Sequence, residues 1–119
     1  MATTTRLIEV FDVHDLSLCQ KVTSAWLQDG EPIAIDAEGL HLGATGRLTL
    51  LQAASRDGKV ILFDVINPDD ILDLSAGKRL IEEGGVKDVL ESNSVLKVLF
   101  YLFGCYEYNI FNINLFIRT

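Results

Sequence analysis

Hydrophobic residues follow two different spacings along the chain, and each change of spacing predicts a new element. Alternating or continuous apolar runs predict strands over residues 6–13, 32–38, 47–54, 59–65 and 95–98. Apolar residues at helical spacing predict helices over residues 15–29, 71–83 and 86–91. The helical crossover before the last strand permits it to pair in parallel with an earlier strand. The pattern therefore predicts an α/β domain in which helices flank a mixed sheet.

Turn-forming residues mark the boundaries of these elements. Gly30 supplies a stop for the first helix, and His14 and Asp15 lie where its N-cap belongs. Ser55-Arg56-Asp57-Gly58 joins two β-type runs and predicts a hairpin. Asn67-Pro68-Asp69-Asp70 breaks the sheet and is expected to start the next helix, with Asp69 or Asp70 near the positive end of its dipole.

Composition limits the possible partners and compartments. The chain has 119 residues and a formal net charge of −7, so it offers no broad basic surface for nucleic acid. Any such contact needs a local basic patch or bridging metal ions. Cys19 and Cys105 lack metal-ligand spacing, which favours reduced core cysteines in a cytoplasmic or nuclear protein. Trp26 is interpreted as core or domain-face packing and not as a platform for base stacking. No apolar signal segment follows Met1.

Two acidic residues stand one residue apart at the end of the second apolar run. Asp36 and Glu38 follow Ile33-Ala34-Ile35, and residues i and i+2 of a strand share a face, about 6.6 Å apart. Two like charges so placed raise each other's proton affinity unless a cation neutralises them. One interpretation is half of a divalent-metal site. The other is a strand end that becomes polar as it meets solvent at Gly39.

Four segments in this order resemble the DEDD family of 3′-5′ exonucleases, and most closely the egalitarian-like branch of its ribonuclease D-like domains. The segments are Ile33 to Gly39, Gly46 to Gln52, Lys59 to Asp64, and Leu90 to Val98. The resemblance implies a ribonuclease H-like fold in which Asp36 and Glu38 are catalytic and bind divalent metal. It also implies two Mg²⁺ or Mn²⁺ ions and hydrolysis of single-stranded RNA or DNA from the 3′ end. Protein partners in RNA metabolism, and no membrane, are expected.

The resemblance ends after Val98, just before the family's second motif. The positions expected to hold His, Asp and the metal-binding Asp are occupied by Phe100, Tyr101 and Cys105, and a thiol is a poor magnesium ligand. The third motif would lie beyond Thr119. We therefore expect residues 1–98 to be the N-terminal part of an exonuclease domain that is incomplete at its C-terminus and inactive in this form.

Residues 99–119 differ in composition from the rest of the chain. Seven of the ten aromatic residues fall after Val98, together with only two charged residues, Glu107 and Arg118. Gly104, Glu107 and several asparagines interrupt the apolar run, which argues against a membrane span. We interpret this segment as sequence that is not native to the family, such as a translated intron or an alternative terminal exon.

Two other functions remain open at this stage. The chain can be a non-catalytic RNA-binding or adaptor domain of the egalitarian type, or an unrelated mixed-sheet domain in which Asp36 and Glu38 are merely solvated. His41 is expected to be an exposed loop residue, and Gln52 to pack or hydrogen-bond within the sheet. The basic residues near strand starts are interpreted as surface charges more than as phosphate clamps: Arg47, Lys59 and Lys97.

Overall fold

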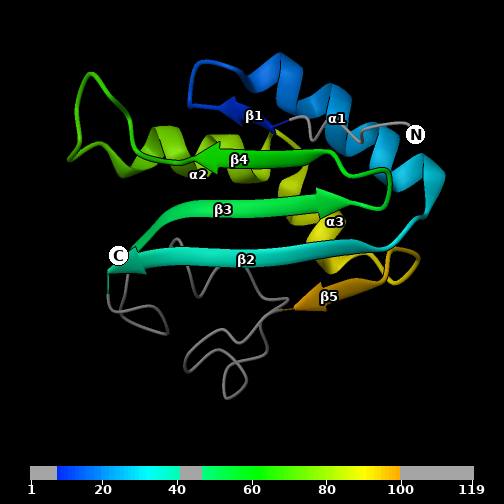
Figure 1. Ribbon diagram of the computed structural model, residues 1–119. Coiled ribbons are helices and arrows are strands. Elements are labelled where there is room, and N and C mark those ends of the chain that lie inside the picture. Colours follow the sequence, from blue (N-terminus) through cyan, green and yellow to red (C-terminus); the bar gives the residue numbers. More distant parts are fainter. Residues whose placement is uncertain (1–7, 41–46, 100–119) are drawn as a thin grey trace, which may run out of the picture.

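A mixed β-sheet with helices on one face makes up the computed structural model, which describes residues 8–40 and 47–99 (Figure 1). The strands are β1 (Ile8–Phe11), β2 (Ile33–Leu40), β3 (Arg47–Ser55), β4 (Val60–Asp64) and β5 (Lys97–Leu99). The helices are α1 (Leu16–Asp29), α2 (Leu74–Glu82) and α3 (Val86–Glu91). The strand order across the described sheet is β1-β4-β3-β2-β5.

The pairing of the strands follows from the lengths of their connections. The short Asp57-Gly58 turn makes β3 and β4 an antiparallel hairpin, and β2 is also antiparallel to β3. Gly58 adopts a left-handed φ of 89°, which glycine reaches without steric cost. Parallel neighbours need a longer crossover, and α2 with α3 supplies one before β5, which pairs in parallel with β2. The predicted α/β class, hairpin and parallel last strand are confirmed.

The core lies between the sheet and the helices. Alternate strand residues point to this side, and Ile33, Ile35, Ile61 and Phe63 are at most 3% exposed. Trp26 of α1 packs edge-on against Phe63, with ring centroids 6.1 Å apart. The predictions that Trp26 and Cys19 are core residues are confirmed, since both are buried. Burial raises the pKa of the Cys19 thiol to about 12.

A close contact between α1 and the α2–α3 junction depends on two glycines. The Thr23 hydroxyl is buried and donates to the carbonyl oxygen of Gly84 at 2.6 Å. Gly85 has φ 87°, and a Cβ atom there would lie 2.3 Å from Thr23 Oγ1. A larger residue at position 85 would therefore push α1 away from the α2–α3 junction. The break expected between the helices at 71–83 and 86–91 is confirmed at Gly84-Gly85, and the positive φ and close approach at Gly85 require a glycine there.

The second helix begins three residues later than the apolar pattern predicted. Asp73 is its N-cap and accepts a hydrogen bond from the Ser75 amide at 3.0 Å, so Asp69 and Asp70 are not the caps. Hydrogen bonds from Ser75 and Asn67 hold the pKa of Asp73 below its ordinary value. The side chain of Asp70 instead accepts from the Leu72 amide within a turn. Competition among three nearby aspartates explains the error, because each can cap a turn.

The first helix also differs in a detail of its N-terminus. Asp15 occupies the N-cap position as expected but makes no side-chain cap bond to the helix. Its carboxylate accepts from the amide of Asp12 at 3.0 Å instead. His14 lies 3.0 Å from the Asp69 carboxylate, so it links this turn to the segment after β4. His14 is thus a structural residue of the turn, in keeping with the capping-region interpretation.

A β-bulge interrupts the pairing of β2 with β3 beside Glu38. Glu38 is opposite Leu50 and Gly39 is opposite Leu48, so Thr49 is the extra residue on β3. The Thr49 hydroxyl donates to the backbone carbonyl of Glu38 at 3.0 Å. Because the bulge absorbs one residue, Leu48 and Leu51 both reach the core although three positions separate them.

Candidate active site

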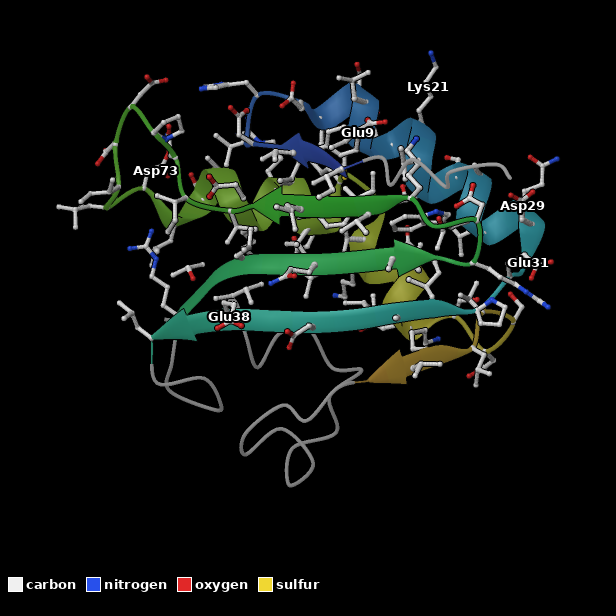
Figure 2. The ribbon with its side chains drawn as sticks, in the orientation of Figure 1. Glu9, Lys21, Asp29, Glu31, Glu38 and Asp73 are labelled. Carbon is white, nitrogen blue, oxygen red and sulfur yellow. The ribbon has the colours of Figure 1, made fainter. Side chains whose placement is uncertain are left out.

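Asp36 and Glu38 lie on the face of the sheet opposite the helices, here called the open face, as the alternating burial along β2 indicates. Glu38 is labelled on this strand in Figure 2. The intervening Ala37 points to the other side and is 7% exposed. Asp36 is half-buried and Glu38 is exposed, so both carboxylates can meet an ion or a ligand approaching this face. The structure thus brings the two predicted site residues to one side of β2. Their assignment as metal ligands and catalytic residues stays a prediction.

The electrostatic surroundings leave the two carboxylates available. Among the described residues, no basic side chain forms an ion pair with Asp36 or Glu38. The Asp36 carboxylate accepts a hydrogen bond from the Ala37 amide at 2.9 Å, which holds it near the backbone. The Thr49 hydroxyl fixes the backbone of Glu38 from the neighbouring strand. Two adjacent oxygen donors on a solvent-facing surface suit a hard divalent cation.

The described residues supply only part of a metal site. Within residues 8–40 and 47–99, no group of three or more His, Cys, Asp or Glu side chains is placed to hold a metal ion. Asp64 shares the open face, because it pairs with Leu50, but it lies two strands from β2, about 9.6 Å away by strand spacing. Asp36 and Glu38 therefore fit half of a divalent-cation site.

Asp64 has a local role at its strand end. Its carboxylate accepts a hydrogen bond from the Ile66 amide at 3.1 Å and so closes the turn that leaves β4. This bond makes Asp64 a polar strand-end residue of β4.

A hollow of about 310 Å³ lies on the open face beside Asp36. Its wall includes Asp36, Gln52 and small or branched apolar residues of three neighbouring strands, namely Ala34, Ala54 and Val60. A larger hollow of about 490 Å³ lies at the opposite end of β2, where Trp26 and Pro32 contribute to its wall. Neither Asp36 nor Glu38 lines the larger one, so the smaller hollow is the one that adjoins the acidic pair.

The basic residues considered as phosphate clamps have partners within the protein. Arg47 donates to the carbonyl oxygen of Ile71 at 2.7 Å, and Lys59 forms an ion pair with Glu9 at 3.2 Å. Lys97 donates to the carbonyl oxygen of Ser92. These contacts favour structural roles for all three. The predictions that concern His41, Phe100, Tyr101 and Cys105 fall outside the described residues, as does nearly all of the interpreted tail at 99–119.

Sequence reasoning missed two residues near the acidic pair, Thr49 and the open-face position of Gln52. The signal for the bulge was the run Leu48-Thr49-Leu50-Leu51, whose apolar residues do not fit strict alternation. Gln52 could have been placed only by the register, which sets it directly opposite Asp36. Register depends on the bulge, so the two omissions share one cause.

Comparison with known proteins bears on the fold. No protein-family model matches the chain, and no curated protein matches its sequence. Among solved structures, the EXD2 exonuclease domain soaked in Mg matches with a TM-score of 0.57 and 26% identity. That match covers 92% of this chain and 50% of the EXD2 chain.

A second solved structure agrees with the first at lower identity. The catalytic core of RRP6 from Trypanosoma brucei matches with a TM-score of 0.53 and 18% identity, over 83% of this chain and 24% of that one. The chain therefore spans about half the length of the EXD2 domain and about a quarter of the RRP6 core. Together with the strand order, these likenesses show that the chain has the ribonuclease H-like α/β fold of 3′-5′ exonuclease domains. No helix among the described residues is long and apolar enough to cross a membrane.

Proposed function

We propose that this chain is part of a 3′-5′ exonuclease-type domain that binds the 3′ ends of single-stranded nucleic acid through divalent cations. The observation that carries the proposal is the position of Asp36 and Glu38, side by side on the open face of an exonuclease-like sheet and without a basic partner among the described residues. Bound Mg²⁺ or Mn²⁺ would supply charge compensation for a phosphodiester.

The charge of the protein explains why cations are central to the proposal. A net charge of −7 repels a polyanion, and the open face adds two carboxylates at the proposed point of contact. Direct phosphate binding by Lys and Arg is therefore disfavoured here. The roles of Asp36 and Glu38 would be to hold the ions against the strand, with the Ala37 amide and the Thr49 hydroxyl keeping both residues in place.

Cation binding is the direct test. Titration of the 119-residue chain with Mn²⁺, followed by loss of the free-ion electron paramagnetic resonance signal, should show binding that the Asp36→Asn/Glu38→Gln double variant weakens at least about tenfold, since even outer-shell changes cost about 10–100-fold. Asp69→Asn/Asp70→Asn is the matched control, because it removes the same charge from an exposed turn. Equal weakening by both pairs would reject the site.

A nuclease assay separates binding from cleavage. Because the described residues provide two carboxylates and no completed metal cluster, we expect the 119-residue chain to bind 3′-labelled single strands in Mn²⁺ without shortening them. Robust shortening that Asp36→Asn abolishes would overturn the expectation of inactivity while retaining the exonuclease assignment. RNA and DNA strands of the same sequence should be compared, since the fold does not distinguish an RNA substrate from a DNA substrate.

The same incomplete cluster favours a second candidate function. A non-catalytic adaptor of the egalitarian type would need to hold RNA but not to cleave it, and two carboxylates without further ligands among the described residues suit that role. The two functions differ in the sequence that continues the domain. A longer form of the chain with aspartates at the two positions expected after Lys97-Val98 favours the enzyme, and a form that lacks them favours the adaptor.

A further inference from the structure

The hollow beside Asp36 has a volume and an apolar wall that metal binding by Asp36 and Glu38 does not explain. It holds about 310 Å³, which is within the range of sites that take small organic groups. Its surface is largely apolar because Ala34, Ala54 and Val60 contribute to it, and its polar side chains are those of Asp36 and Gln52. An apolar wall with a few placed polar groups is the usual composition of a ligand pocket.

Gln52 is a polar side chain of this hollow whose amide has no hydrogen-bond partner within residues 8–40 and 47–99. It lies directly opposite Asp36 in the antiparallel pairing of β2 and β3, so the two side chains are neighbours on the open face. Gln52 is half-buried, and among the described residues its amide makes no hydrogen bond. A primary amide can donate two hydrogen bonds and accept two. The amide atoms of Gln52 are open to solvent, since no buried side-chain nitrogen or oxygen among the described residues lacks a partner, so a ligand in the hollow can reach them. The position is therefore suited to a ligand that offers both a donor and an acceptor.

We propose that this hollow binds the base of the nucleotide whose phosphate lies at Asp36 and Glu38, and that Gln52 contacts the edge of the base. The inference rests on the proposed function and names the part of the substrate that the metal ligands do not recognise. A base has apolar faces that match the alanine and valine wall, and its edge presents donors and acceptors that match the amide. Adenine is the base expected to bind best, because Gln can pair with it through two hydrogen bonds.

The arrangement along β2 fits the dimensions of a nucleotide. The hollow extends from Asp36 toward Ala34, whereas Glu38 lies on the other side of Asp36 along the same strand. Residues i and i+2 on a strand face lie about 6.6 Å apart, so the hollow and the acidic pair share Asp36 while Glu38 lies just beyond the hollow. A phosphate near Glu38 and Asp36 would thus place the attached sugar over Asp36 and the base over Gln52.

Nuclear magnetic resonance of the ¹⁵N-labelled 119-residue chain tests the proposal. Adenosine 5′-monophosphate is titrated in the presence of Mg²⁺ while the side-chain amide signals of Gln52 and Gln28 are followed. We expect a saturable shift of the Gln52 signals and no shift of Gln28, which lies exposed on α1. Gln52→Leu should weaken binding about tenfold. Gln28→Leu, the matched control, should leave the affinity unchanged.

Ribose 5-phosphate separates this inference from the proposed function. It carries the sugar and phosphate without the base, so Gln52→Leu should not change its binding, whereas Asp36→Asn/Glu38→Gln should reduce it. If ribose 5-phosphate and the adenine nucleotide bind equally and the Gln52 signals stay still, the base site is wrong and the proposed function stands. If neither compound binds in Mg²⁺, both proposals are overturned. Equal affinity for the cytidine and adenosine monophosphates would reject the adenine preference.

Discussion

The two faces of the sheet are built from the same strands, and they differ in what covers them. Toward the helices, alternate residues such as Ile33, Ile61 and Phe63 are almost wholly buried. On the open face, Ile8 is 63% exposed and Val10 is 57% exposed, and the central strands carry Asp36, Gln52 and Asp64. Within the described residues, the covered face therefore holds most of the buried core, while the open face presents the polar side chains of the candidate site.

The largest effect on stability should come from truncating a core residue of β4, and the same truncation of its neighbour on the open face should cost much less. Phe63→Ala removes a fully buried ring that packs against Trp26 and Phe11, and should lower the free energy of unfolding by about 3–5 kcal/mol. Leu62→Ala, on the open face, should cost about 1 kcal/mol. Urea unfolding followed by Trp26 fluorescence measures both. Equal costs would mean that the open face is as well packed as the other.

A smaller loss is expected where α2 approaches the end of β4. A Cβ atom on Gly77 would lie 2.2 Å from the carbonyl oxygen of Val65, so Gly77→Ala must displace the helix from the covered face. We expect a loss of about 1–3 kcal/mol. Lys78→Ala, on the exposed side of the same helix, is the control and should change stability little. A stabilising Gly77→Ala variant would show that α2 is not held against the sheet as described.

Alkaline pH tests the burial of Cys19 on the covered side. Its pKa is raised from the ordinary value of 9.0 to about 12, so the folded state favours the neutral thiol. The contribution to stability is complete below pH 9 and is lost as the pH rises toward 12. Between pH 7 and pH 10, the advantage of the wild-type chain over Cys19→Ala should therefore shrink by about 1 kcal/mol. A constant difference across that range would contradict the buried thiol.

The smallest effect on stability is expected at the acidic pair itself. Without added metal, Asp36→Asn/Glu38→Gln should change the free energy of unfolding by no more than about 0.5 kcal/mol, and in the stabilising direction, because like charges on one strand face repel. Thermal unfolding in a chelating buffer measures it. A loss above about 1.5 kcal/mol would make the two residues structural and remove the contrast between the faces.

Much of the covered face could be predicted from the sequence, because burial imposes periodic patterns. The run at Val60-Ile61-Leu62-Phe63 and the helical spacing of Leu18, Val22 and Trp26 each identified an element correctly, although Leu18 itself is 49% exposed. Periodicity does not reveal which face a helix covers, so the exposure of Ile8 and Val10 could not be foreseen. The start of α2 was missed because its cap is chosen among several aspartates by local geometry that the pattern does not encode.

The candidate site was predictable only in part. The spacing of Asp36 and Glu38 implied a shared face, and the structure places them on one. Their neighbours across the sheet depend on register, and the register near Glu38 is changed by the bulge at Thr49. The broken alternation of residues 48–51 indicates an irregularity but does not say which of these residues is the extra one. The family resemblance supplied the fold, which the solved exonuclease domains support. The metal ligands and the substrate remain predictions for the experiments above.

The bulge at Thr49 has a consequence for how this region can change in evolution. Removing that single codon would leave Leu48 and Leu51 two positions apart, still on one side of an ordinary pleat, so the sheet could close without it. The loss would instead fall on the hydroxyl that holds the Glu38 carbonyl. A protein carrying such a deletion would keep the sheet but lose a contact that holds the backbone of Glu38. Such a deletion would therefore alter the position of one site residue without removing the fold.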